Sequence, residues 1–138
     1  MKKEVKFSLV YRDMWQSSGK YVPRKDQLEK IAPLIIDMGC FDRVETNGGA
    51  AEQVNLLYGE NPNPSVRTFT AALHKGGIEC HMLDRALNAL RMNPVPADVR
   101  QLMYKVKKAQ GVDITLSSAV SMTCVTSSRP SIGPTKLA

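Results

Sequence analysis

The feature that most constrains the fold is a regular alternation of short strand-like segments with longer helix-like segments along the 138 residues. Strand patterns occur at 4–10, 41–46 and 78–83, and a fourth begins at Val112. The helices expected between them cover residues 24–38, 50–58, 65–74 and 94–110. Such alternation implies an α/β fold in which parallel strands are joined by right-handed crossovers, as in α/β barrels and doubly wound sheets.

Three segments in or between the expected helices contain residues that predict a kink, a break or a buried face. Pro33 lies inside the first helix and is expected to kink it. Residues 61–64, Asn-Pro-Asn-Pro, are expected to form a break between two helices. The last helix is expected to bury one apolar face and to expose a basic face to solvent. The apolar face consists of Val99, Leu102, Met103 and Val106, and the basic face of Lys105, Lys107 and Lys108.

Composition excludes several classes of protein. The formal net charge is +6, but the basic residues are not clustered and no aromatic platform accompanies them, so no nucleic-acid partner is expected. No apolar run approaches the roughly 20 residues of a membrane span, and the N-terminus lacks the apolar region of a secretory signal. Cys40, Cys80 and Cys124 are an odd set without C-x-x-C spacing, so neither a disulfide framework nor a thiolate zinc site is expected. The expected location is therefore the cytoplasm.

Two charged residues, Arg12 and Asp13, directly follow the first expected strand. In α/β barrels the loops at the carboxyl ends of the strands gather the catalytic groups. A carboxylate there can bind a divalent metal, since hard cations prefer oxygen ligands. The alternative is that Arg12 and Asp13 pair with each other or cap a loop.

Three segments resemble motifs of one enzyme family. Residues 11–17, Y-R-D-M-W-Q-S, resemble the L-R-D-A-H-Q-S motif of the biotin-dependent carboxyltransferases, which include pyruvate carboxylase, the oxaloacetate decarboxylase alpha chain and transcarboxylase. Residues 44–50, V-E-T-N-G-G-A, are similar to the family's E-x-W-G-G-A, and residues 82–88, M-L-D-R-A-L-N, to its M-L-L-R-G-Q-N. The resemblance covers residues 5 to about 115 and implies the N-terminal half of a TIM (β/α)8 barrel, about four βα units.

The resemblance also implies roles for five residues. Asp13 would be a metal ligand and Arg12 a neighbouring catalytic cation. Gln16 would contact the keto acid, and Arg85 would bind its carboxylate through two parallel hydrogen bonds. Glu52 matches the acid of the family's G-G-A-T-F-D stretch if one residue is deleted nearby.

The implied reaction is carboxyl transfer between biotin and pyruvate or oxaloacetate through a pyruvate enolate that a divalent metal (Zn, Mn, Mg or Co) stabilises. Biotin would be carried on a separate carrier domain or subunit, and full-length members would be homo-oligomers. The metal also needs a carboxylated lysine and an H-x-H pair from later strands, whereas this chain has only His74 and His81. His81 is expected to be a core or loop histidine. The metal site is therefore expected to be incomplete, and the chain to be an inactive fragment.

Two other functions stay open, since the H-x-H and lysine ligands are absent, and three residues depart from the motifs as a divergent subgroup would. Asn47 replaces a Trp, Met92 falls where a substrate-contacting Tyr is expected, and Glu52 is longer than the family's Asp. One alternative is a non-catalytic half-barrel that binds or assembles with a partner. The other is a related aldolase or condensing-type TIM-barrel lyase, against which the motifs around Gly48 and Arg85 argue.

The segment 116–138 differs in composition from the partial barrel domain at 1–115: it is rich in Ser and Thr, has no acidic residue and is expected to be irregular. It is interpreted either as a disordered extension or as the product of a frameshift near Leu116. When 117–131 are back-translated with TCN serine codons and read two bases out of frame, they permit F-V-C-G-L-N-D-V-R-N-I-I-P-S-I. The first part of this stretch is similar to the family's F-D-A-L-N-D-x-R-N. A half-barrel with open sheet edges is expected to self-associate.

Overall fold

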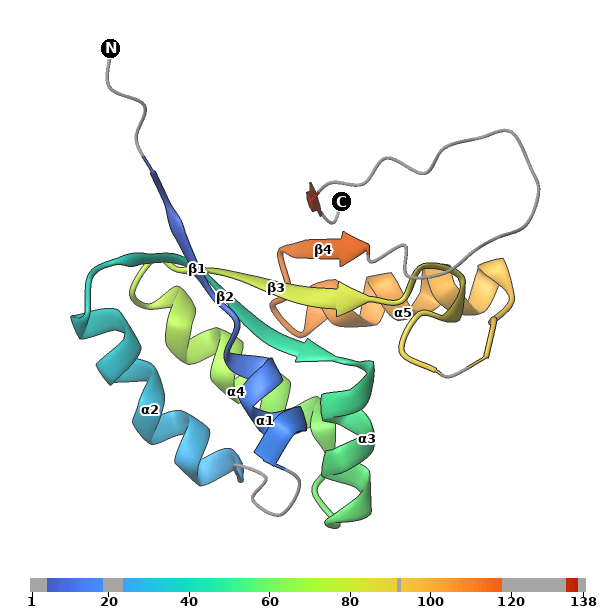
Figure 1. Ribbon diagram of the computed structural model, residues 1–138, viewed down its shortest axis with the longest axis horizontal. Coiled ribbons are helices and arrows are strands. Elements are labelled where there is room, and N and C mark those ends of the chain that lie inside the picture. Colours follow the sequence, from blue (N-terminus) through green and yellow to red (C-terminus); the bar gives the residue numbers. More distant parts are fainter. Residues whose placement is uncertain (1–4, 19–23, 92, 118–133, 137–138) are drawn as a thin grey trace.

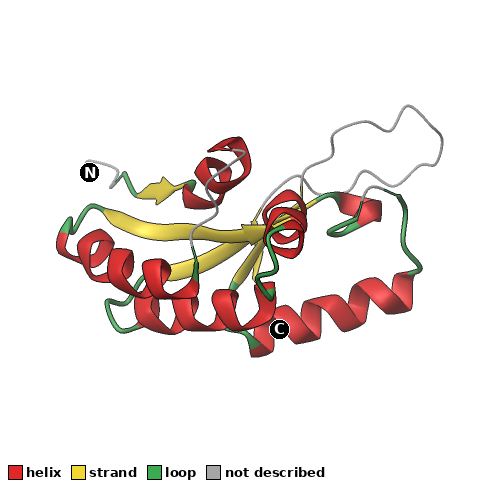
Figure 2. Ribbon diagram, turned by 90° about the horizontal axis from the view of Figure 1, so that it is seen from below, coloured by secondary structure: helices red, strands yellow, loops and turns green. Residues whose placement is uncertain are grey.

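The computed structural model describes residues 5–18, 24–91, 93–117 and 134–136, which form one sheet with helices packed against it (Figure 1). In chain order the elements are β1 (Phe7–Leu9), α1 (Tyr11–Ser18), α2 (Lys25–Asp37), β2 (Phe41–Gly48), α3 (Gly49–Leu57), α4 (Pro62–His74), β3 (Glu79–Asp84), the short 3-10 turn η1 (Ala86–Asn88), α5 (Ala97–Ala109), β4 (Ile114–Ser117) and β5 (Pro134–Lys136). Figure 2 shows the long helices on one side of the sheet. Among the described helices, none has both the length and the apolar character that a bilayer span requires.

The sheet has the strand order β1-β2-β3-β4-β5. The first four strands are parallel, so the predicted α/β alternation is confirmed. The fifth strand, β5, pairs with β4 in the antiparallel direction and lies inside the segment expected to be irregular. That expectation is wrong for residues 134–136, because the free edge of β4 offers backbone groups that a short strand can pair with. Most of the proposed frameshift segment, residues 118–131, lies outside the described residues.

Several element boundaries differ from the expected ones for local reasons. The residues after β1 form the first turn of α1 instead of an extended strand end. Residues 61–64 do not break the chain between helices but start α4: the Asn61 side chain accepts a hydrogen bond from the Asn63 backbone N–H at 3.0 Å, and Pro62 occupies the first turn, where no N–H is needed. Helix α2 spans Lys25–Asp37 as one element with Pro33 inside it.

The hydrophobic core lies between α2, α4 and the helix-facing side of the strands. Its larger cluster consists of Leu28, Ala32, Ile35, Val44, Ala51, Phe69, Leu73, Ile78 and Cys80. A smaller cluster joins Val66, Met82 and Val112, with Met103 and Tyr104 packed against it. The Tyr11 ring lies 5.4 Å from the Phe69 ring, so the first turn of α1 also touches this core.

Of the four apolar residues that α5 is expected to bury, only Met103 packs inward, against the smaller core cluster. Val99, Leu102 and Val106 point outward, and Leu102 is 61% exposed. The inward face contains Tyr104 and Lys107 instead, and Lys107 is only 3% exposed, so its predicted place on a solvated face is wrong. Burial of these polar groups is tolerated because each has a carboxylate partner. The apolar strip of α5 is left without a neighbouring helix among the described elements.

Candidate functional site

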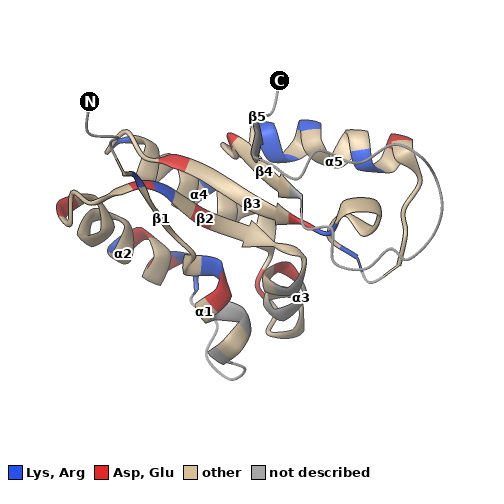
Figure 3. Ribbon diagram, turned by 45° about the horizontal axis from the view of Figure 1, so that its top comes forward, with Lys and Arg blue, Asp and Glu red and all other residues tan. Residues whose placement is uncertain are grey.

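The candidate site lies where β1, β2 and β3 end, because parallel strands bring their carboxyl ends to one edge of the sheet. Each strand runs there into the segment that carries a motif: β1 into α1, β2 into α3 and β3 into η1. Figure 3 shows charged residues on α1, near the start of α3 and at the end of β3. The fold thus brings the three motifs to one edge of the sheet, a placement that the sequence predicts only for Arg12 and Asp13.

Arg12 is a buried cation held by a buried carboxylate. Its Nε donates a hydrogen bond to Glu45 Oε1 at 2.8 Å, and both side chains are almost fully buried. Burial raises the pKa of Glu45, and the nearby Arg12 guanidinium partly opposes that rise. A Cβ on Gly48 would lie 2.7 Å from Arg12 Cδ, so only glycine lets the arginine side chain cross the end of β2. These contacts fix the guanidinium in one place.

Glu52, the second predicted catalytic residue, is held by two donors. Asn47 Nδ2 donates to Glu52 Oε1 at 2.9 Å, and Lys107 Nζ forms an ion pair with the same oxygen. Lys107 Nζ also donates to Gln110 Oε1 at 3.2 Å. The arrangement fastens α5 to the end of β2. Since Asn47 stands where the motif has a tryptophan, this departure supplies a partner that Glu52 needs.

Arg12 and Glu52 contact neighbouring residues at the end of β2, because Arg12 packs on Gly48 and Glu52 binds the adjacent Asn47. Asp13 differs from both: its side chain is 59% exposed, and its Oδ1 lies 3.8 Å from an Arg12 nitrogen. Gln16 is in α1, but its side chain lies outside the described part, as does Met92. Arg85 directly follows β3 and is half-buried.

The turn after Arg85 is strained. Ala86 has φ 51° and Ala89 has φ 52°, a left-handed region that costs a residue with a Cβ about 1 kcal/mol. The family motif has glycine at the position of Ala86. The strain is held by α5, since Arg100 donates to the Ala86 carbonyl at 3.1 Å. Strained turns of this kind gather at functional sites.

Asp84, the last residue of β3, fastens the same region to α5. It is fully buried, and Tyr104 Oη donates a hydrogen bond to its Oδ2. Burial raises the pKa of Asp84, and the bond from Tyr104 partly offsets that effect. Burial and the same carboxylate raise the pKa of Tyr104 to about 12. Tyr104 therefore remains a hydrogen-bond donor at neutral pH.

Glu45 is a site residue that was not singled out from the sequence, and His81, expected only as a core or loop histidine, lies beside it in the sheet. Glu45 was visible as the first residue of the E-x-W-G-G-A motif. His81 pairs in register with Glu45, and its Nε2 lies 2.7 Å from Ser8 Oγ. Burial, assisted by Arg43 and Arg12, lowers the pKa of His81 to about 4. The prediction of a core or loop histidine is confirmed, on a polar face of the sheet.

The described residues do not form the metal site that the resemblance implies. Within residues 5–18, 24–91, 93–117 and 134–136, a single group of three or more His, Cys, Asp or Glu side chains brings its ligand atoms together, and Asp13 is not in it. An exposed carboxylate beside an arginine offers one ligand, whereas a divalent cation needs several. No chemical step can therefore be assigned through a metal at Asp13 from these residues.

Comparison with solved structures shows which fold this is. The carboxyl transferase domain of Rhizobium etli pyruvate carboxylase, solved with oxamate and biotin, matches with a TM-score of 0.74 and 20% sequence identity, over 84% of this chain and 20% of that chain. The same domain with pyruvate matches with a TM-score of 0.71 and 19% identity, over 84% of this chain and 20% of that chain. The domain with 3-bromopyruvate matches with a TM-score of 0.69 and 19% identity, over 83% of this chain and 19% of that chain.

Comparison by sequence alone identifies no such relative. No protein-family model matches it, and no curated protein sequence is significantly similar. The chain spans about a fifth of the length of the solved domain, 20% in the first comparison. The described chain therefore has the α/β fold of one part of the TIM-barrel-type carboxyltransferase domain of pyruvate carboxylase.

Proposed function

We propose that this chain provides the first βα units of a barrel that transfers a carboxyl group between biotin and pyruvate or oxaloacetate. The observation that carries the proposal is the fold likeness, with a TM-score of 0.74 over 84% of the chain. The solved domain with that fold was determined with oxamate and biotin, and again with pyruvate. The three motifs of this chain lie at one edge of the sheet, where barrels of this class bind substrates.

The proposed roles follow from what each side chain can do. Arg12, clamped by Glu45, presents a fixed positive charge, and Glu45 is its positioning residue. Arg85 binds the keto-acid carboxylate through its planar guanidinium, and Gln16 contacts the keto acid. Glu52 is best interpreted as a positioning residue as well, since Asn47 and Lys107 occupy its carboxylate.

A fixed guanidinium suits this reaction. When pyruvate accepts a carboxyl group, its methyl carbon loses a proton and negative charge develops on the keto oxygen. A preorganised cation in a buried setting stabilises such a charge without reorganising during the reaction. Asp13 remains the proposed metal ligand, and the other ligands of that metal would come from other segments or chains. The biotin carrier and the remaining barrel strands would come from other segments or chains as well. The full-length protein is proposed to be homo-oligomeric.

Titration of the 138-residue chain with oxamate and with pyruvate, followed by calorimetry or NMR, tests this proposal. We expect Arg85→Ala to abolish binding and Arg85→Lys to weaken it about tenfold or more, because lysine cannot reproduce the bidentate contact. Arg91→Ala is the matched control, since Arg91 is an exposed arginine of the same loop, and it should bind as the parent does. Absence of binding by the parent chain, or unchanged affinity in Arg85→Ala, would contradict the proposal.

A second candidate is a non-catalytic half-barrel that binds a keto acid or a partner. The Lys107–Glu52 pair favours it, because an acid engaged by a buried ammonium is poorly suited to proton transfer. The two candidates differ in turnover. Pyruvate formation from oxaloacetate in the presence of biotin supports the enzyme, and oxamate binding without any such turnover supports the binding protein.

A further inference from the structure

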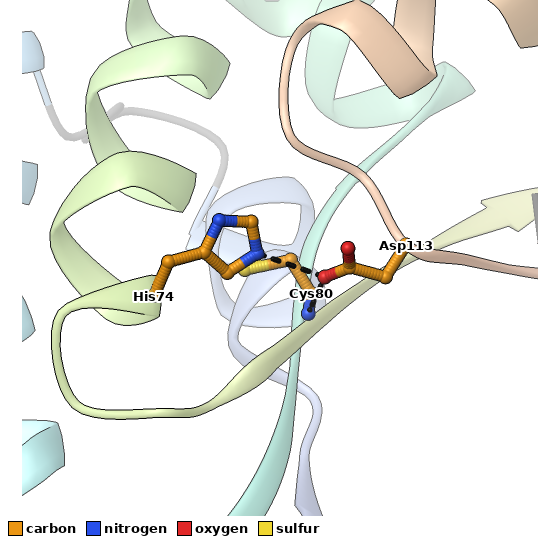
Figure 4. Close-up of side chains that lie close together, drawn as sticks. All are labelled: His74, Cys80 and Asp113. Atoms are coloured by element: carbon orange, nitrogen blue, oxygen red, sulfur yellow. Dashed lines mark hydrogen bonds and ion pairs between the residues drawn. The ribbon is translucent and has the colours of Figure 1, made fainter.

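A second cluster of reactive side chains lies at the opposite end of the sheet from the candidate site. His74 ends α4, Cys80 is near the start of β3, and Asp113 directly precedes β4 (Figure 4). The amino ends of neighbouring parallel strands meet there, which brings together residues that are distant in sequence. Nothing in the proposed carboxyl transfer uses these three residues.

The three side chains already share contacts. His74 Nε2 lies 2.8 Å from Asp113 Oδ2, and the Cys80 backbone N–H donates to that same oxygen at 2.9 Å. The imidazole nitrogen, thiol sulfur and carboxylate oxygen of the group lie within 4.8 Å of one another. Cys80 is fully buried, whereas the side chains of His74 and Asp113 are 38% and 33% exposed. The cluster is therefore closed on its sulfur side and open to solvent on the other.

The geometry does not suit a nucleophilic cysteine. In a cysteine–histidine–aspartate relay, one ring nitrogen faces the nucleophile and the other faces the carboxylate. Here the Nε2 that faces Asp113 is on the same edge of the ring as the sulfur (Figure 4). Burial, assisted by Asp113, also raises the pKa of the Cys80 thiol, which disfavours the reactive thiolate.

We propose that His74, Cys80 and Asp113 form a binding site for a zinc-like divalent cation, which Nε2, Sγ and a carboxylate oxygen would ligate together. One nitrogen, one sulfur and one oxygen match the donors that Zn²⁺ takes in proteins, whereas Mg²⁺ and Ca²⁺ prefer oxygen alone. On binding, the thiol proton leaves to solvent, a sulfur–metal bond forms, and the His74–Asp113 hydrogen bond gives way to two metal bonds. The open side leaves room for a water as fourth ligand.

The backbone around the cluster supports the ligands. The Cys80 N–H continues to orient the Asp113 carboxylate after a metal binds, a contact that typically strengthens a site. A Cβ on Gly111 would lie 3.3 Å from His74 Cε1 and 2.7 Å from Thr70 Oγ1, so glycine in this turn lets the imidazole approach. Thr70 Oγ1 donates to the Gln110 carbonyl at 2.6 Å and ties α4 to the same turn.

The bound ion would connect α4, β3 and β4 and stabilise the amino end of the sheet. This role is independent of the proposed carboxyl transfer, because the three ligands lie at the other end of the strands from Arg12 and Arg85. Either proposal can therefore fail without the other.

Titration of the tag-free, chelator-treated 138-residue chain with Co²⁺ tests the site, because a cobalt–thiolate bond gives a charge-transfer absorption band. We expect one equivalent of Co²⁺ to produce this band, Zn²⁺ to abolish it by displacement, and Zn²⁺ to raise the Tm of the chain. Cys80→Ser should lose the band, and His74→Gln, at a partly exposed position, should weaken Co²⁺ affinity about tenfold or more.

The matched control is the double variant Cys40→Ser/Cys124→Ser, which keeps Cys80 as the remaining cysteine and should keep the band. Absence of the band in the parent chain, its persistence in Cys80→Ser, or its loss in the double variant would each overturn the proposal. If Cys80→Ser fails to fold by circular dichroism, His74→Gln and Asp113→Asn decide, and unchanged Co²⁺ affinity in both overturns it.

Discussion

The layer formed by α2 and α4 and the layer formed by α5 cover the same sheet by different means. The first buries a continuous apolar cluster around Phe69 and Leu28. The second turns Tyr104 and Lys107 inward onto carboxylates and turns its apolar strip outward. The comparison shows that an amphipathic pattern identifies a helix but does not decide which of its faces packs on the sheet.

The difference has a physical basis. A helix of a βα barrel contacts the sheet and a helix on each side, so its apolar residues serve more than one interface. Helix α2 packs against α4, and the side chains of the two helices share one core. No described helix lies beyond α5, so Leu102 stays 61% exposed. We therefore expect the apolar layer to dominate stability and the polar layer to dominate specificity of packing.

The largest effect should come from the centre of the apolar layer. Phe69 is fully buried, and Phe69→Ala removes a ring that contacts both Tyr11 and the strand side chains. We expect a loss of about 3–5 kcal/mol in the free energy of unfolding, measured by urea denaturation. A loss below about 1 kcal/mol would mean that this layer is not the main source of stability.

In the polar layer, Lys107→Ala should lower the free energy of unfolding by about 3 kcal/mol, because it leaves the Glu52 carboxylate without its ammonium partner. Lys105→Ala is the matched control on the exposed side of the same helix and should change it by less than about 0.5 kcal/mol. The double variant Lys107→Met/Glu52→Gln should cost less than the sum of its single changes. Equal effects at Lys105 and Lys107 would contradict the buried ion pair.

Polar burial should also respond to pH, which apolar burial does not. The pKa of His81 is lowered from its ordinary value of 6.5 to about 4, so between these values the unfolded chain binds a proton that the folded chain does not. Stability therefore falls as the pH falls, by about 2 kcal/mol from this group between pH 7.5 and pH 5. In urea denaturation at pH 7.5 and pH 5, the free energy of unfolding of His81→Gln should fall by about 2 kcal/mol less than that of the parent chain. An identical fall in parent and variant would contradict the assignment.

The smallest effect is expected on the outward strip of α5. Leu102→Ala should change the free energy of unfolding by less than about 0.5 kcal/mol, since most of the side chain is already in water. Leu28→Ala makes the same change at a fully buried position and should cost about 2–5 kcal/mol. Comparable losses at both leucines, in denaturation at low protein concentration, would show that the α5 strip is covered in solution.

Much of the fold follows from local sequence. The strand and helix alternation and the parallel pairing of β1 to β4 were predicted, whereas the meeting of the three motifs at one edge of the sheet is seen only in the structure. Arg12 and Glu52 were predicted as site residues, and the structure buries the first and engages the second. The start of α4 at Pro62 was missed because a proline-rich segment usually predicts a break, although here Asn61 caps the helix.

The type and order of the other elements can be read from the chain alone, because hydrophobic period and turn residues act within one segment, whereas α1, η1 and β5 were not expected. Which side chains meet across segments was settled only when the elements packed together. The Arg12–Glu45 and Lys107–Glu52 pairs join residues 33 and 55 positions apart, and the Cys80–Asp113 contact joins residues 33 apart. Such pairs depend on sheet register and on the rotation of each helix about its axis, and these are set by burial summed over the whole molecule.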